Sequence, residues 1–266
     1  MGADAHPAQA WRRDAFAKSG MAIDLIMCIG QASRKAAHCV VFTLREVGLA
    51  RGWSTMLRRL VEWGARCVVR AMGAGQRKRW TVSRAAMYRQ IADFSTGLPR
   101  GGRVLDISGS STLIDCMQLA PSERVEVHYP EVSILALPFP DASFDWAVSD
   151  QCLEHIVGDP GAAMREVMRV LKPGGQMLHT TCFVTPYHGG GGLADFWRFS
   201  PEALAYLCRD AAQVHADGSG NPLANLLTSL LPFEPVPEAP RHPLNRLLDQ
   251  PSRGHTSMVW VWARKG

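Results

Sequence analysis

The stretch LPFPDASFDWAVSDQCLEHIVGDPGAAMREVMRVLKPGG, residues 137–175, decides the fold because a turn, a strand, a loop and a helix follow one another without a break. Residues 144–148 form a short apolar run with one acid, which is typical of a strand covered on both faces. Asp159 is a good N-cap, and Pro160 follows where a helical residue needs no N–H. An apolar helix stripe comes next, at Met164, Val167, Met168 and Leu171. The Lys-Pro-Gly-Gly run at 172–175 then ends the helix.

This stretch resembles the class I S-adenosylmethionine-dependent methyltransferases, and among them the type 11 methyltransferase domain family. The resemblance rests on PFPDASFDWAVS at 138–149, LEHI at 153–156 and RVLKPGG at 169–175. It extends from about residue 103 to 207, with a last strand at 258–263, and the first hundred residues have no counterpart in it. The resemblance implies a Rossmann-like sheet with an antiparallel last strand, and S-adenosylmethionine as the cofactor.

The rest of the chain gives the same fold class from its own pattern. Strands are predicted at 103–107, 124–127, 144–149 and 176–181, and helices at 84–98, 112–119, after Asp159, and at 200–207. Such alternation predicts an α/β fold with a parallel sheet flanked by helices. We expect a basic helical extension at 1–98 and a methyltransferase-like domain at 99–266. Within that domain, a Pro-rich insert at about 217–256 is expected to be irregular, either as a lid or as a poorly ordered segment.

Composition narrows the class of protein. The chain has 266 residues, of which 47% are hydrophobic and 20% charged, as in an ordinary globular protein. Its seven cysteines are scattered without a CxxC pair, which indicates reduced thiols and neither a disulfide framework nor a zinc site. We therefore expect no metal. No run of 18 apolar residues is present, so we expect no membrane span and a cytoplasmic location.

Charge is distributed unevenly. Residues 1–100 hold 17 Lys and Arg against 6 Asp and Glu, a net +11, whereas residues 101–266 carry a net −6. A predicted helix at 53–73 places arginines around an apolar face, made by Met56, Leu60, Trp63, Cys67 and Val68. This helix either lies on a membrane surface, making the protein membrane-peripheral, or packs its apolar face on a core; we favour packing. Nucleic acid is not an expected partner, because aromatic residues do not interleave with the basic run.

The resemblance also implies which residues border the cofactor. The loop after the first strand supplies Asp106, Ser108, Gly109 and Ser110, the second strand supplies Glu126 for the ribose hydroxyls, and Asp150 and Gln151 follow a later strand. Serine or threonine stands at 108, 110 and 112, where the family has three glycines, and the short segment before 137 indicates that a helix and a strand are trimmed. An alternative is therefore a catalytically degenerate protein of the same fold that serves as a binding module or scaffold.

A second segment points to the acceptor. Residues 185–201 resemble a His…Asp-Tyr-Trp-Arg-Phe-Thr segment of methyltransferases associated with glycan assembly. The resemblance implies a small-molecule or glycan hydroxyl as acceptor, with His188 or Asp195 taking its proton. Arg198 would bind a phosphate or carboxylate, and Tyr187 would stack on a sugar ring. The alternative is structural, because Asp195 and Arg198 lie three residues apart and can pair with each other.

Overall fold

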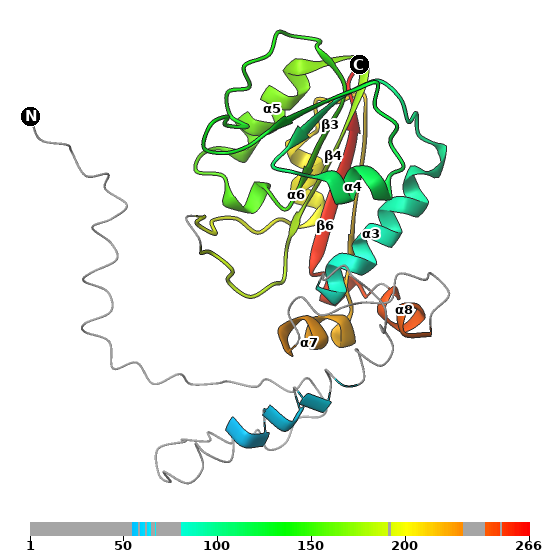
Figure 1. Ribbon diagram of the computed structural model, residues 1–266, viewed down its shortest axis with the longest axis vertical. Helices are drawn as coiled ribbons and strands as arrows, with labels where there is room; N and C mark the ends of the chain where they lie inside the picture. Colours follow the sequence, from blue (N-terminus) through cyan, green and yellow to red (C-terminus); the bar gives the residue numbers. More distant parts are fainter. Residues whose placement is uncertain are drawn as a thin grey trace, which may run out of the picture. The chain divides into compact units, whose positions relative to one another are not determined.

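The structure is a computed structural model that describes residues 81–190, 193–230, 243–250 and 252–266, together with parts of 55–67. The chain divides into two compact units, residues 1–58 and 59–266, and nearly all of the first lies outside the described residues. The second unit is built on one six-stranded sheet with the strand order β2-β1-β3-β4-β6-β5 (Figure 1).

The sheet is parallel in its first part and antiparallel in its last. β2, β1, β3 and β4 pair in parallel, and β6 runs antiparallel between β4 and β5. The predicted α/β class, with a Rossmann-like sheet and an antiparallel last strand, is thereby confirmed. The strands are β1 (Arg103–Ile107), β2 (Glu123–Val127), β3 (Phe144–Asp150), β4 (Leu171–Cys182), β5 (Gln213–Ser219) and β6 (Met258–Arg264).

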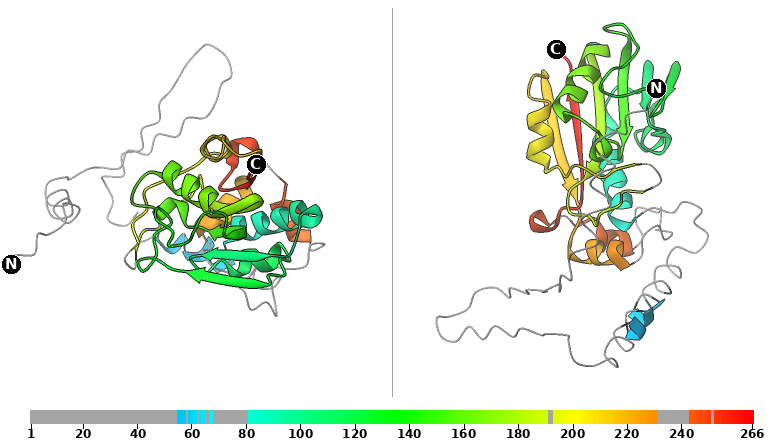
Figure 2. Two further views of the ribbon diagram at one scale, coloured as in Figure 1. Left: turned by 90° about the horizontal axis from the view of Figure 1, so that it is seen from above. Right: turned by 90° about the vertical axis from the view of Figure 1, so that its left-hand side faces the viewer.

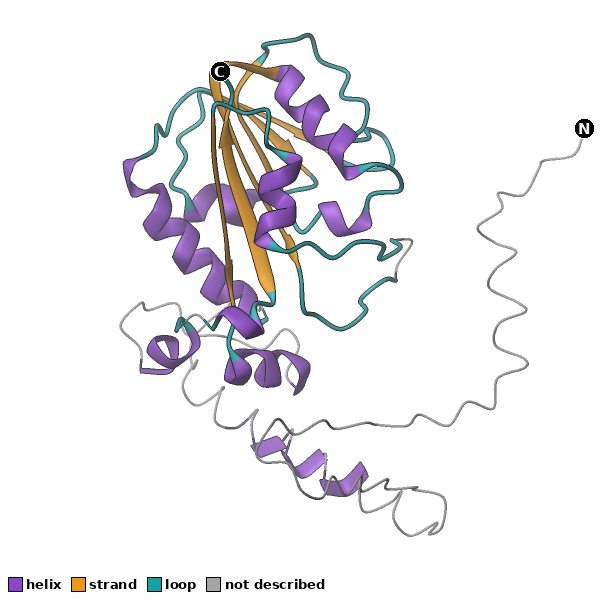
Figure 3. Cartoon of the chain, turned by 180° about the vertical axis from the view of Figure 1, so that it is seen from behind, coloured by secondary structure: helices purple, strands orange, loops and turns teal. Residues whose placement is uncertain are grey.

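Helices cover both faces of this sheet (Figures 1, 2 and 3). Two of them, α3 (Val82–Phe94) and α4 (Ser111–Cys116), pack on a cluster that includes Trp146 and Trp260. Two more, α5 (Pro160–Val170) and α6 (Pro201–Leu207), pack on the opposite cluster, which includes Phe144 and Ala147. The neighbours Trp146 and Ala147 of β3 thus serve opposite cores, as the alternation of side chains along a strand requires. A register shift between Phe144 and Trp146 interrupts this alternation and places Phe144 in the same cluster as Ala147.

Local signals in the sequence fix the helix starts. The carboxylate of Asp159 accepts a hydrogen bond from the Gly161 N–H, and the Ser200 hydroxyl accepts one from the Ala203 N–H. Both are side-chain caps of otherwise unpaired donors, and each is followed by a proline. The two predicted N-caps are therefore confirmed.

Three segments differ from the expected pattern. Helix α3 belongs to the core of the sheet, although its residues were expected in the extension, and its end is followed by a 3₁₀ turn, η2 (Ser95–Gly97). Residues 128–143 contain neither a helix nor a strand, in agreement with the expected trimming. The insert is not irregular throughout, because the end of β5, α7 (Pro222–Leu230), α8 (Pro243–Leu248) and η4 (Arg253–His255) lie within it.

The predicted basic helix falls mostly outside the described residues. Its described parts are helical turns within 55–67, where Met56, Leu60 and Trp63 are each more than half exposed. The expectation that this helix packs on a core therefore stays a prediction. Among the described helices, none combines the length and the apolar character needed to cross a bilayer.

Candidate active site

The order of the strands points to one edge of the sheet. The chain forms β1 in the middle, places β2 on one side of it and β3 on the other. In open α/β sheets, such a reversal leaves a crevice outside the carboxyl ends of the two strands, and ligands bind there. Here the backbone leaves both strands through left-handed turns, with φ of 64° at Ser108, 73° at Gly109 and 56° at Gln151. The predicted cofactor residues of the first loop thus lie at this crevice.

Asp106 organises the loop from within the protein. Its side chain is fully buried, and one carboxylate oxygen accepts a hydrogen bond of 2.6 Å from the Ser110 N–H. The other oxygen accepts from the Arg124 guanidinium, with Nε at 2.8 Å. The Ser110 hydroxyl is also committed, since it donates to the Ile107 carbonyl at 2.7 Å. Asp106 and Ser110 therefore shape the loop rather than present polar atoms to a ligand.

Gly109 leaves space that a side chain would fill. A Cβ at this position would lie 3.4 Å from His128 Cε1 and 3.6 Å from the Glu126 Oε1 atom. Glu126 is partly exposed and shares its carboxylate between Arg124, at 3.2 Å, and His128, at 2.7 Å. A glycine facing an accessible carboxylate fits the ribose hydroxyls of a nucleoside, which need close backbone approach and an acceptor.

Asp150, at the end of β3, is held by helix α3. Its carboxylate accepts hydrogen bonds from Arg84 at 2.6 Å, Tyr88 at 2.5 Å and Thr180 at 2.6 Å. Burial and the Asp150 carboxylate together raise the pKa of the Tyr88 hydroxyl. The only local signal of this network in the sequence is the spacing of Arg84 and Tyr88, four residues apart on one helix face, and it was not among the expected sites.

Gln151 and Cys152 connect the two loops of the crevice. Gln151 donates its backbone N–H to the Thr180 carbonyl at 3.1 Å and its side-chain amide to the Thr180 hydroxyl. The Cys152 sulfur lies 3.7 Å from the Ser108 hydroxyl, and burial raises the pKa of this thiol to about 11. Cys152 is therefore a neutral packing residue and not a nucleophile.

Asp195 and Arg198 pair with each other in the structure. The two side chains form a two-pronged ion pair, with Arg198 Nη2 2.6 Å from Asp195 Oδ2, and Asp195 also accepts the His188 backbone N–H at 2.9 Å. The Arg198 hydrogen bonds lower the pKa of Asp195 well below its ordinary value. Asp195 is thus a weak base that positions His188, while Tyr187 is 70% exposed beside it.

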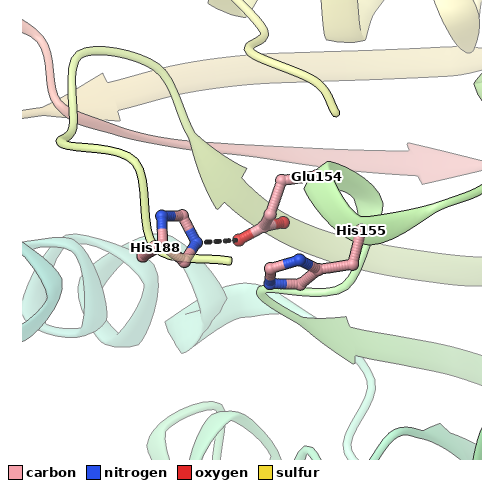
Figure 4. A group of neighbouring side chains, drawn as sticks. All are labelled: Glu154, His155 and His188. Carbon is pink, nitrogen blue, oxygen red and sulfur yellow. Dashed lines mark ion pairs between the residues drawn. The ribbon is translucent and has the colours of Figure 1, made fainter. Parts of the chain in front are cut away.

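Next to this pair lies a cluster in which His188, an expected site residue, meets two residues that the sequence did not indicate as site residues. Glu154 and His155 belong to the 3₁₀ turn η3 (Leu153–His155) directly after β3, and His188 approaches from the loop after β4 (Figure 4). Glu154 is fully buried, and its Oε1 atom faces His188 Nε2 at 3.8 Å. The Glu154 carboxylate is the main reason that the pKa of His188 is raised above its ordinary value.

Backbone hydrogen bonds hold this cluster together. The Glu154 carbonyl accepts the N–H groups of Phe196, at 2.8 Å, and Trp197, at 3.1 Å, and the Trp197 indole donates to the Ile156 carbonyl at 2.9 Å. Phe199 is buried against the core. Residues 194–197 are therefore attached to η3 and the residue after it. The Glu-His pair directly after a buried strand is the one sequence signal that could have indicated the cluster.

Comparison with known proteins supports a methyltransferase domain. Residues 90–179, which include β1 to β3 and most of β4, match the family model described as a methyltransferase domain. The chain is 37% identical over 109 residues to the uncharacterised protein YafE of Escherichia coli K12, covering 37% of this chain and 48% of that protein. It is 38% identical over 90 residues to the ubiquinone/menaquinone biosynthesis C-methyltransferase UbiE of Vibrio cholerae, covering 33% and 34%. The matches thus span about half or less of the length of these relatives.

A solved structure with a similar arrangement is a possible histamine N-methyltransferase from Thermotoga maritima. It has a TM-score of 0.42 and 18% identity, over 70% of this chain and 92% of that protein. Residues 90–179 of this chain thus match a methyltransferase domain, and this match indicates S-adenosylmethionine as the cofactor.

Proposed function

We propose that the protein transfers the methyl group of S-adenosylmethionine to a hydroxyl of a small molecule or glycan. The observation that carries the proposal is the reversal of strand order at β1 and β3, where left-handed turns at Ser108, Gly109 and Gln151 follow the two strands within the methyltransferase match. Binding at such a crevice is the general behaviour of open α/β sheets. The alternative of a degenerate scaffold is not favoured by the comparisons.

The residues after β1, β2 and β3 have different proposed roles in cofactor binding. Ser108 and Gly109 supply close backbone approach, Glu126 accepts the ribose hydroxyls, and Gln151 borders the cofactor from the neighbouring strand. Asp106 and Asp150 position these residues and do not contact the cofactor themselves, because their carboxylates accept hydrogen bonds from protein donors. When bound, S-adenosylmethionine supplies an electrophilic methyl group on a sulfonium.

The acceptor is proposed to enter from the side of Tyr187 and His188. A hydroxyl is a poor nucleophile at neutral pH, so a base that takes its proton accelerates the attack. His188 is the better candidate for this base, since Glu154 raises its pKa whereas Arg198 lowers that of Asp195. The base form of His188 exists above its raised pKa, so turnover should rise as the pH passes through that value. Tyr187 offers an exposed aromatic face for a sugar ring.

Cofactor binding is tested by titration calorimetry with S-adenosylmethionine on the full chain and on two glycine variants. Gly109→Ala should weaken binding by about tenfold, because its methyl group would enter the space before Glu126 at a positive φ. The matched control Gly101→Ala, where nothing lies within 4 Å of the added carbon, should bind normally. A wild-type chain that gives no heat and no thermal shift with the cofactor would refute the proposal.

Methyl transfer is then measured as release of S-adenosylhomocysteine in the presence of panels of glycans and small alcohols. His188→Ala should slow turnover much more than it changes cofactor affinity. If turnover with an identified acceptor is unchanged in this variant, His188 is not the base.

A peripheral membrane contact is a separate proposal. It rests on the exposed Met56, Leu60 and Trp63 in a segment whose sequence is rich in arginine. Sedimentation with anionic lipid vesicles tests it: the full chain should pellet at low salt, and a Leu60→Glu/Trp63→Glu variant should not. Equal sedimentation of both proteins would refute it.

A further inference from the structure

The cluster of Glu154, His155 and His188 has one feature that the proposed proton transfer does not explain. Each side chain offers one ligand atom, and the three atoms lie within 4.8 Å of one another. The rings of His155 and His188 are nearly perpendicular, with centroids 5.2 Å apart, and Figure 4 shows both beside the Glu154 carboxylate. The cluster comes from two segments more than thirty residues apart, so no spacing in the sequence predicts it.

Hydrogen bonds fix which atom of each histidine is available. His155 Nδ1 lies 2.7 Å from the Ala194 carbonyl, and His188 Nδ1 lies 3.2 Å from the Pro186 carbonyl. Because a carbonyl oxygen only accepts, both Nδ1 atoms must carry the proton. In the neutral rings this leaves a lone pair on each Nε2, and His188 Nε2 is directed at the carboxylate.

The Glu154 carboxylate also has one oxygen atom available for a ligand. Glu154 Oε2 accepts a hydrogen bond from the Thr181 hydroxyl at 2.8 Å, whereas Oε1 is buried with no hydrogen-bond partner in the described part of the chain. A separation of 3.8 Å from His188 Nε2 is too long for a hydrogen bond. A buried carboxylate oxygen without a partner is costly unless a positive charge compensates it.

We infer that Glu154, His155 and His188 form a binding site for a divalent first-row transition-metal ion. Two imidazoles and one carboxylate are a ligand set that suits zinc, iron, cobalt and nickel, and three protein ligands leave positions open for a further molecule. The Ala194 and Pro186 carbonyls and the Thr181 hydroxyl are the outer partners that orient such ligands. Ligand atoms around a tetrahedral ion with bonds of about 2.1 Å lie about 3.4 Å apart, so small side-chain rotations close the set.

The ion would take the place of a proton between Glu154 and His188. Binding releases that proton wherever His188 Nε2 carries one. The metal site does not depend on methyl transfer, but its use does: with the ion bound, His188 Nε2 would be a ligand and no longer the base, and an open coordination position would instead hold the acceptor oxygen and favour loss of its proton to water.

The test is metal binding by the full chain after treatment with a chelator. Cobalt(II) is titrated while its visible d–d absorption is recorded, and zinc(II) is titrated by calorimetry. We expect one ion per chain, and a loss of affinity of at least about tenfold in Glu154→Gln, His155→Asn and His188→Asn. His255→Asn, at an exposed histidine outside the cluster, is the matched control and should bind as the wild type does.

The outcomes separate this inference from the proposed function. Absence of one-to-one binding, or equal binding by the wild type and all three cluster variants, overturns the inference. If one variant fails to fold in a thermal unfolding scan, the other two decide. Cobalt binding without cofactor binding would refute methyl transfer alone, and cofactor binding without cobalt binding would refute the metal site alone.

Discussion

The ion pair between Asp106 and Arg124 should be the strongest electrostatic link between β1 and β2. We expect Asp106→Asn to lower the free energy of unfolding by about 2–3 kcal/mol and Arg124→Gln by about 3 kcal/mol, since a buried hydrogen-bonded charge loses its partner. The Asp106 side chain is fully buried and that of Arg124 is 34% exposed. The double variant should cost less than the two single losses together, by about 2 kcal/mol, because neither partner is then left alone.

Urea unfolding of the four proteins, followed by tryptophan fluorescence, measures this coupling. A control on the same two strands is the pair of Arg103 and Glu123, whose closest contact is 2.8 Å and whose side chains are 34% and 56% exposed. Glu123→Gln should cost less than about 1 kcal/mol, because water screens an exposed pair. If the losses of Asp106→Asn and Arg124→Gln add within about 0.5 kcal/mol, the reasoning from burial is wrong.

Three further changes test other parts of the unit. Burial lowers the pKa of His179 from 6.5 to about 3, so the folded state excludes the proton that the unfolded chain binds. The free energy of unfolding should therefore fall as the pH drops below 6.5, by about 3 kcal/mol at pH 4.5. In urea titrations at several pH values, His179→Asn should remove this part of the pH dependence. Tyr88→Phe should cost about 1–3 kcal/mol in the same assay, because the Asp150 carboxylate loses a donor at 2.5 Å. Gly102→Ala should lower the melting temperature, while Gly101→Ala should not, because only Gly102 combines a φ of 108° with a Cβ position 2.6 Å from a neighbouring side chain.

The sequence predicted those parts of the fold that local chemistry determines. The caps at Asp159 and Ser200 and the short buried strand at 144–150 follow from residue types within a few positions of one another. β5 was missed because its residues, QVHADGS, are polar and half-exposed, and only pairing with β6 along seven positions makes them a strand. Its register depends on contacts about 45 residues away, which no local pattern encodes.

In the candidate site too, the local features were predictable from the sequence and the distant contacts were not. The loop at 106–110 was located through its family resemblance, but the partners that commit Asp106 and Asp150 come from β2 and from a helix outside the resemblance. A polar residue type suggests a contact with a ligand. Whether its side chain is free to make that contact depends on which protein donors already bind it in the folded state. For Asp195, the partner three residues away was visible in the sequence, and the structure shows that pair.

The crevice and the histidine cluster are joined by six consecutive residues, 150–155. Gln151 turns the chain out of β3, Cys152 lies 3.7 Å from the Ser108 hydroxyl, and Glu154 and His155 follow within the next turn. The same segment is bonded to β4 through Thr180 and Thr181. We expect a ligand at Ser108 that shifts this segment to change the geometry of the Glu154 carboxylate and His188 as well. Where the two sites are linked in this way, each ligand changes the affinity of the other to the same degree.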